Sequence, residues 1–135
     1  LNLYAESIND EALKELAPLV NLRELDLSLT SVSDAGLRYL TALKKLSSLT
    51  LLYSEGFAGP KITNIGLKPL SEMTQLRTLN LVGAKIDDTG VDDLMRLRNL
   101  KRLILVGSQL SSDGLKRLQV VLPDCEISAD YRLRK

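Results

Sequence analysis

Two pairs of adjacent aspartates, Asp87-Asp88 and Asp92-Asp93, form the densest group of carboxylates in the chain. Paired carboxylates serve as general acid and base in hydrolysis, and clustered carboxylates bind divalent cations. Both uses need a cleft that gives the two groups different surroundings, whereas Asp87 stands where a helix cap is expected. We therefore interpret these aspartates as capping and solvated groups, and we predict neither a catalytic pair nor a metal site here.

Other reactive groups are scarce. The chain has no histidine and a single cysteine, so mechanisms that need an imidazole, an internal disulfide or a cysteine-rich zinc site are excluded. Neither a GxGxxG nor a GxxxxGK[ST] phosphate-binding motif occurs. Cys125 is either a small residue of the last strand or a reactive thiol, and the second use needs a lowered pKa and exposure. The sequence predicts no enzyme and no cofactor.

The composition is that of a soluble globular domain. The 135 residues have 44% hydrophobic and 26% charged side chains, and 18 Lys and Arg against 17 Asp and Glu give a net charge of +1. This balance argues against a dedicated nucleic-acid or anionic-membrane binder. No apolar run approaches the roughly 18 residues of a membrane span, and no signal peptide is visible. A single cysteine favours a reducing, cytoplasmic compartment, although secreted repeats without disulfides exist.

A repeated LxxLxL pattern fixes how the remaining residues are positioned. It begins at Leu22, Leu46, Leu76 and Leu100, in steps of 24, 30 and 24 residues, and the chain contains 31 leucines in all. Partial copies precede and follow these four, at Leu1-Asn-Leu3 and at Ile127. Such periods are typical of a solenoid, in which stacked units bury the leucines that one unit cannot bury alone. We predict a solenoid over 1–127 and a polar, basic tail over 128–135.

The second half of each unit repeats as well. A helix-capping residue is followed three positions later by a small residue, and then by apolar residues at every third position. A glycine in a helix costs about 1 kcal/mol against alanine, so its recurrence indicates that a side chain there would meet the neighbouring unit. Each unit is predicted to be a short strand, a capped loop and a helix of about three turns. The caps are Asn9, Ser33, Thr63, Asp87 and Ser111, and the small residues are Ala12, Gly36, Gly66, Gly90 and Gly114.

The segment from Leu22 to Leu43, LxxLxLxxTxVSDAGLxxLxxL, closely resembles the leucine-rich repeat family. It is similar to the 24-residue, helix-containing type of bacterial multi-repeat proteins and of F-box leucine-rich proteins. The resemblance implies an α/β, right-handed solenoid with parallel strands on the concave face and short helices on the convex face. It also implies a scaffold that binds proteins, mostly on the concave sheet. The usual Asn or Cys is replaced by Glu6, Thr30, Ala84 and Ser108, which leaves the hydrogen bonding of the strand-to-helix turn open.

The residues between the strand leucines are expected to face outward, because side chains alternate along a strand. Stacking would place them in columns, with Leu52, Val82, Ile104 and Val106 close together and Tyr53 nearby. Exposed aliphatic side chains on adjacent strands are typical of an interaction surface, although β-branched residues also simply suit strands. The predicted partner-binding residues are Tyr4, Glu24, Asp26, Ser28, Thr50, Leu52, Tyr53, Phe57, Asn80, Val82, Arg102, Ile104 and Val106.

The 30-residue step carries a six-residue insertion within 52–61. It holds the only phenylalanine, Phe57, with glycines on both sides. Insertions in solenoids emerge as loops, often on the binding side, so Phe57 is either an anchor for the partner or a side chain folded over the core edge. Pro69 in the following helix is expected to kink or shorten that helix.

Acidic and basic residues gather at opposite edges of the predicted solenoid. Acidic residues lie at the helix starts, and basic residues lie near the helix ends and strand starts. This distribution favours either the stabilisation of helix dipoles or two charged rims that orient a partner. The acidic residues are Asp10, Glu11, Asp34, Glu55, Asp87, Asp88 and Asp113, and the basic residues are Lys44, Lys45, Arg77, Arg98, Lys101 and Arg102.

The sequence as a whole predicts a protein-binding module for a partner of unknown identity. Leu1 begins inside a strand without a polar cap, so we expect a preceding segment or a longer parent chain. Two alternatives stay open: assembly through the N-terminal edge, or a recognition domain joined to an enzyme, with further repeats or domains in the same chain.

Overall fold

The strands and helices alternate along the chain and form two layers. The computed structural model describes residues 1–3, 7–54, 56 and 59–129. The strands are β1 (Glu24–Asp26), β2 (Ser48–Thr50), β3 (Thr78–Asn80), β4 (Arg102–Leu105) and β5 (Glu126–Ala129). The helices are α1 (Asp10–Lys14), α2 (Asp34–Leu37) with the 3₁₀ helix η1 (Arg38–Ala42), α3 (Asn64–Leu70), the 3₁₀ helix η2 (Asp88–Gly90) with α4 (Val91–Leu94), and α5 (Ser112–Val121).

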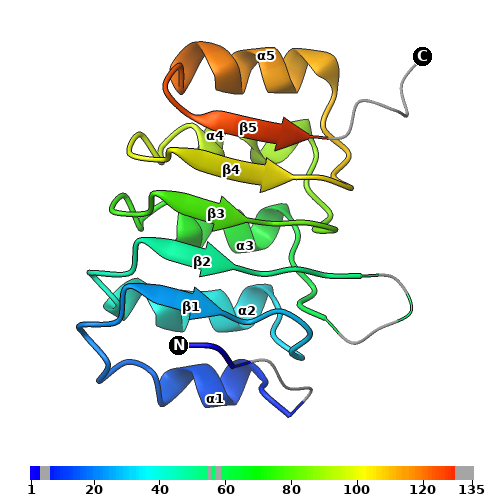
Figure 1. Cartoon of the computed structure of the whole chain (residues 1–135). Helices are drawn as coiled ribbons and strands as arrows, with labels where there is room; N and C mark the ends of the chain where they lie inside the picture. Colours follow the sequence, from blue (N-terminus) through cyan, green and yellow to red (C-terminus); the bar gives the residue numbers. More distant parts are fainter. Residues whose placement is uncertain (4–6, 55, 57–58, 130–135) are drawn as a thin grey trace.

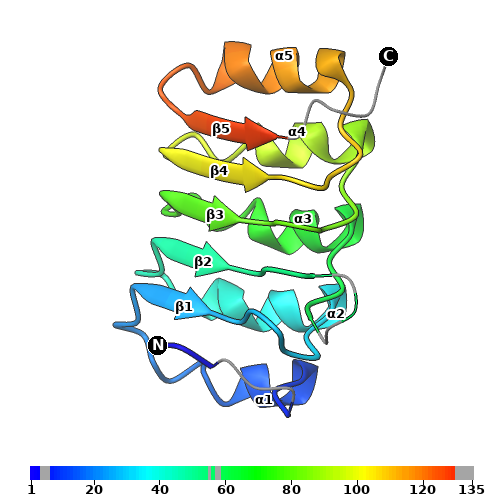
Figure 2. The ribbon, with the colours of Figure 1, turned by 45° about the vertical axis from the view of Figure 1, so that its right-hand side comes forward.

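The five strands form one parallel sheet in the order β1-β2-β3-β4-β5. Glu24 pairs with Ser48, Ser48 with Thr78, Thr78 with Arg102, and Arg102 with Glu126, so equivalent positions of successive units are aligned. In Figure 1 each strand runs to the right, and the chain returns behind the sheet through a helix to the strand above. This path is right-handed. Figure 2 shows that the sheet forms one side of the molecule and the helices form the other. The predicted α/β solenoid is confirmed.

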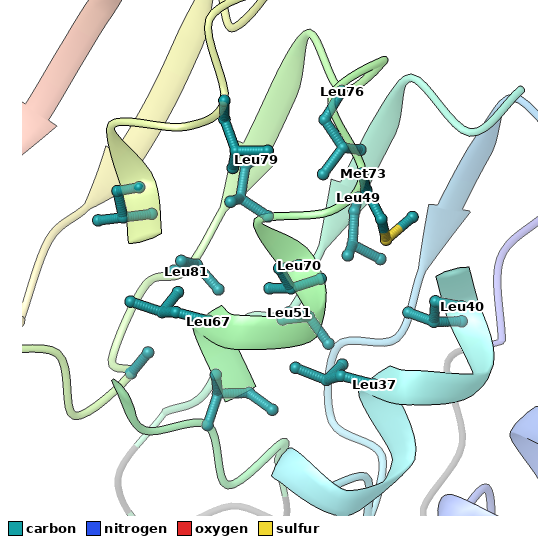
Figure 3. Close-up of a cluster of buried hydrophobic side chains, with 14 of the residues drawn as sticks. Leu37, Leu40, Leu49, Leu51, Leu67, Leu70, Met73, Leu76, Leu79 and Leu81 are labelled. Carbon is teal, nitrogen blue, oxygen red and sulfur yellow. The ribbon is translucent and has the colours of Figure 1, made fainter. Parts of the chain in front are cut away.

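The leucines of the LxxLxL pattern fill the space between the two layers. Leu79 and Leu103 are completely buried, whereas the intervening Asn80 and Ile104 are partly exposed. Figure 3 shows strand residues such as Leu49 and Leu79 pointing toward helix residues such as Leu70. A buried leucine stabilises the fold by roughly 1.5–3 kcal/mol, so this ladder is the main source of stability. The predicted alternation of inward and outward residues is confirmed.

The helices reach the predicted three turns in only some of the units. α5 has ten residues and α2 with its continuation η1 covers nine, whereas α1 has five and α3 has seven. A 3₁₀ helix rises about 2.0 Å per residue against 1.5 Å in an α-helix, so it covers the return to the next strand with fewer residues. The length of each unit therefore limits its helix, which a pattern of apolar residues at every third position does not reveal.

Pro69 lies inside α3, which has seven residues. The continuous helical stretches of the neighbouring units, 34–42 and 88–94, have nine and seven residues. Proline removes the amide that would bond to the carbonyl of Ile65. The expectation that Pro69 kinks or shortens this helix stays a prediction.

Three of the strands, β1, β3 and β4, are followed by a tight turn that the backbone closes. The amides of Ala84 and Ser108 donate to the carbonyls of Leu81 and Leu105 at 3.1 and 3.0 Å. The residue before each donor has a positive φ, 76° at Gly83 and 81° at Gly107, and Leu29 has the same conformation at 57°. Backbone hydrogen bonds thus close the turns at Ala84 and Ser108 without the expected asparagine side chain, and at Thr30 the hydroxyl also donates to the carbonyl of Leu27 at 2.7 Å.

Changing these two glycines to alanine tests the turn. Gly83→Ala and Gly107→Ala each place a side chain in the left-handed region, which costs about 1–2 kcal/mol. Only at Gly83 would the new Cβ also lie 2.5 Å from the carbonyl oxygen of Tyr53. We expect Gly83→Ala to lower the free energy of unfolding by at least about 1 kcal/mol more than Gly107→Ala. Urea denaturation measures both, and equal losses would contradict the close approach.

A second set of hydrogen bonds joins the helix starts of adjacent units. The residue after each cap reaches across to the cap of the next unit, and the carboxylates predicted to complement helix dipoles therefore also tie the units together. Asp10 binds Ser33, with 2.8 Å to its amide and 2.6 Å to its hydroxyl. Asp34 binds Thr63 at the same two distances, Asp88 binds the amide and hydroxyl of Ser111, and Asn64 binds Asp87.

The recurring glycine makes room for this bond. A Cβ at Gly66 would fall well inside contact distance of the Asp34 carboxylate, and a Cβ at Gly114 would do the same to Asp88. Gly36 and Gly90 stand in the same relation to Asp10 and Asn64. The prediction that a side chain here would meet the neighbouring unit is confirmed.

Candidate functional site

The outward-facing residues of the strands form one continuous surface, here called the sheet face. Glu24 and Arg102 are exposed, and Asp26, Thr50 and Asn80 are partly exposed. Arg102 lies 3.8 Å from the Glu126 carboxylate, but both side chains are well exposed, so this ion pair adds little stability. The structure thus brings the predicted polar contact residues of the sheet together on one face.

Two of these polar side chains are held by the backbone that follows them. The Asp26 carboxylate accepts a hydrogen bond from the backbone amide of Ser28 at 2.9 Å. The side-chain oxygen of Asn80 accepts one from the backbone amide of Val82 at 3.1 Å. Such bonds fix the side chain and leave little conformational freedom to lose on binding. Ser28 itself is only 7% exposed, so the expectation that it lies at the surface was wrong: its side chain is enclosed where the strand turns toward the helix layer.

Four aliphatic residues at the carboxyl ends of β2, β3 and β4 form an apolar patch, defined as Leu52, Val82, Ile104 and Val106. Their backbones are neighbours, because the amide of Tyr53 donates to Val82 at 2.9 Å and the amide of Gly83 donates to Val106 at 2.8 Å. Val106 is 38% exposed and the other three are partly exposed. The backbone pairing thus places these four residues on adjacent strands, as predicted.

The described part of the insertion packs beside this patch. Gly59 and Pro60 are buried, and a Cβ at Gly59 would lie 2.9 Å from the Tyr53 ring. Next to them is a hollow of about 300 Å³, here called the loop hollow, most of whose surface is apolar. Tyr4, Glu55 and Phe57 lie outside the described residues. The loop hollow is lined by Tyr53, Pro60, Lys61, Ile62, Thr63, Gly83 and Lys85.

The sequence prediction included only Tyr53 among these lining residues. Lys61 and Lys85 occupy the same position of successive units, and the amide of Lys85 donates to Ile62 at 2.9 Å. Their shared phase is visible in the sequence, but nothing in it shows that the insertion leaves a hollow between them. The hollow follows from the backbone path around Tyr53.

Three of the four aspartates that first suggested chemistry have structural contacts: Asp87, Asp88 and Asp92. The carboxylate of Asp87 accepts from the amide of Thr89 at 2.9 Å as a helix cap, and Asp92 pairs with Arg117 at 2.5 Å. Within the described residues, no group of three or more Cys, Asp or Glu side chains is placed to hold a metal ion. No described helix is long and apolar enough to cross a bilayer.

Cys125 is partly buried, with its Sγ 3.7 Å from the carbonyl of Glu126. Burial raises the pKa of this thiol, nearby Lys101 opposes the rise, and Glu126 adds to it. A raised pKa reduces the thiolate fraction at neutral pH, which is the opposite of what a reactive cysteine needs.

Two of the repeats match a known family of sequences. The leucine-rich repeat family matches residues 19–40 and 72–95. No curated protein sequence matches the chain significantly.

Several solved structures share the fold. Internalin C2 from Listeria monocytogenes is 23% identical with a TM-score of 0.71, over 96% of this chain and 50% of that one. A leucine-rich-repeat protein from Leptospira interrogans is 23% identical with a TM-score of 0.60, over 85% and 27%. The leucine-rich-repeat ectodomain of the Arabidopsis thaliana receptor kinase SOBIR1 is 18% identical with a TM-score of 0.55, over 86% and 59%. The chain thus spans between about a quarter and three fifths of these structures, and the likeness concerns the fold.

Proposed function

Because the chain is a leucine-rich-repeat protein, we propose that it is a non-catalytic module that binds another protein on its sheet face. Proteins with this fold commonly act in protein–protein interaction. The finer proposal is that the partner contacts the apolar patch at the strand ends and is helped by the neighbouring 52–61 loop.

The apolar patch is the observation that carries this proposal. Four aliphatic side chains from three adjacent strands are partly exposed on a face that is otherwise polar. Binding free energy is concentrated in such apolar centres surrounded by polar groups. The patch also sits on a sheet held by main-chain hydrogen bonds, so little order has to be gained on binding.

The loop hollow supports a contribution from the insertion. It adjoins the patch through the chain itself, since Tyr53 follows Leu52 and Gly83 follows Val82. A largely apolar recess of about 300 Å³ offers space for a side chain of the partner. We propose that the patch and the loop hollow form one contact surface.

A pair of charge-introducing variants tests the proposal. Val82→Glu/Val106→Glu places two carboxylates on the patch, and desolvating them against an apolar partner should weaken binding about tenfold or more. Affinity capture identifies proteins retained by the wild type, and titration of a purified captured protein measures the loss of affinity.

The matched control is Ile65→Glu/Val120→Glu on the helix face. These residues are 77% and 79% exposed, so the control introduces the same two charges away from the sheet. Circular dichroism checks that both variants fold. Binding that survives the patch variant, or that falls equally in the control, would remove the sheet face from the proposal.

A further inference from the structure

A row of cations follows the edge where each helix returns to the next strand, here called the basic edge. These residues belong to the segments just before β1, β2, β3 and β4, and those segments lie at the left of the sheet in Figure 1. All of them are exposed. The basic edge consists of Arg23, Lys44, Lys45, Arg77, Arg98 and Lys101.

The charge of the basic edge is not neutralised by other described residues. Among the residues that the structure describes, the basic side chains in ion pairs are Lys14, Arg102, Lys116 and Arg117, and none of the six belongs to them. Lys45 only donates to the side-chain oxygen of Asn21, at 2.7 Å. Asp10, Asp34 and Asp88 at the helix starts accept hydrogen bonds from the next unit. Glu11 and Asp113 stay well exposed, so only part of the acidic rim suggested by the sequence is used within the fold.

The basic edge also contains a recess, here called the edge hollow. It has a volume of about 360 Å³ and a mostly polar surface. Three cations and three neutral hydrogen-bonding side chains line it: Arg23, Lys45, Arg77, Ser47, Gln75 and Asn99. Arg23 and Arg77 are two units apart, or roughly 10 Å at the backbone, so their long side chains can meet on one anionic group.

We propose that the basic edge binds an acidic segment of a protein partner, with one carboxylate side chain seated in the edge hollow between Arg23, Lys45 and Arg77. This surface lies at the strand starts, whereas the apolar patch lies at the strand ends, so the inference goes beyond the function proposed above. Guanidinium groups bind carboxylates through paired, charge-assisted hydrogen bonds. Unpaired cations also accelerate the encounter with an oppositely charged partner.

The surroundings favour an acidic peptide over a nucleic acid. The carboxylates of Glu24 and Glu126 are exposed at the starts of β1 and β5, where they would repel a continuous phosphate backbone. No aromatic side chain lines the edge hollow, so a base would find no stacking surface there. A short acidic segment can lie between these two acidic groups.

Fluorescein-labelled hexaglutamate, with blocked ends, is the probe for this test. Fluorescence anisotropy at about 20 mM salt and neutral pH gives its affinity for the wild type and for two variants. Arg23→Glu/Arg77→Glu reverses two charges in the edge hollow, and Lys68→Glu/Lys116→Glu reverses two exposed charges on the helices. Both variants have the same net charge, so long-range attraction is matched between them.

We expect Arg23→Glu/Arg77→Glu to lower the affinity for hexaglutamate about tenfold and the helix variant to change it less than about twofold. Circular dichroism confirms folding of both. Equal loss in the two variants, or no binding of hexaglutamate to the wild type, would overturn the proposal. Tighter binding of a six-nucleotide oligothymidylate would overturn it in favour of a nucleic acid. Val82→Glu/Val106→Glu should leave hexaglutamate binding within about twofold of the helix variant, which separates this test from that of the sheet face.

Discussion

Replacing Leu79 by alanine should lower the free energy of unfolding by about 3–5 kcal/mol, because its side chain is completely buried at the centre of β3 and the sheet cannot close the cavity. Its neighbours above and below, Leu49 and Leu103, are aligned with it by the parallel register and stay in place. Urea denaturation followed by circular dichroism measures the loss.

Asn80→Ala is the control for this prediction. Asn80 is the next residue of the same strand, but its side chain faces outward and buries no apolar surface in the core. Its loss removes one hydrogen bond to the amide of Val82, which is worth about 1 kcal/mol. A cost for Asn80→Ala that equals or exceeds that of Leu79→Ala would show that the assignment of inward and outward residues is reversed.

Gly66→Ala should destabilise the fold by about 2–3 kcal/mol, although alanine is the better helix former by about 1 kcal/mol. The added methyl would collide with the Asp34 carboxylate, which is held in place by the amide and hydroxyl of Thr63. Asp34→Ala alone should cost about 2 kcal/mol, since it removes two hydrogen bonds to a charged acceptor.

The double variant Asp34→Ala/Gly66→Ala separates this collision from other effects. Once the carboxylate is absent, the methyl at position 66 meets mainly the Leu37 side chain, whose Cδ1 would lie 2.9 Å away and can rotate. We expect the double variant to lose at least about 1 kcal/mol less than the sum of the two single variants. Additive losses would mean that the glycine is required for a reason other than the bond between units.

The features that depend on one unit could be predicted from the sequence. The LxxLxL spacing predicted the register of the strands and which leucines are buried. Each such leucine has the same environment as its equivalent in the preceding unit, as Leu103 has that of Leu79. The caps were also visible, because Ser33 and Thr63 are suitable residue types at the start of an apolar helical pattern.

The features that arise between units could not be read in the same way. Asp34 looked like a helix-dipole residue, and its bond to Thr63, 29 positions away, becomes evident only when two units are stacked. The loop hollow depends on how the backbone passes Tyr53, and the hydrogen bonds of Asp10, Asp34 and Asp88 depend on contacts across units. Ser28 was misplaced for a related reason: period-2 alternation ends where the strand begins to turn.

The bond between helix starts has chemical directionality. Three junctions join a hydroxyl cap to a carboxylate of the preceding coil, but the junction to Asp87 has a carboxylate cap and accordingly an amide donor, Asn64. Two facing carboxylates would repel, so the carboxylate cap at Asp87 requires an amide partner such as Asn64. The units of this stack therefore cannot be exchanged freely. When units are added, removed or reordered, the two hydrogen-bonded residues of each junction must be transferred together and in the same order along the chain.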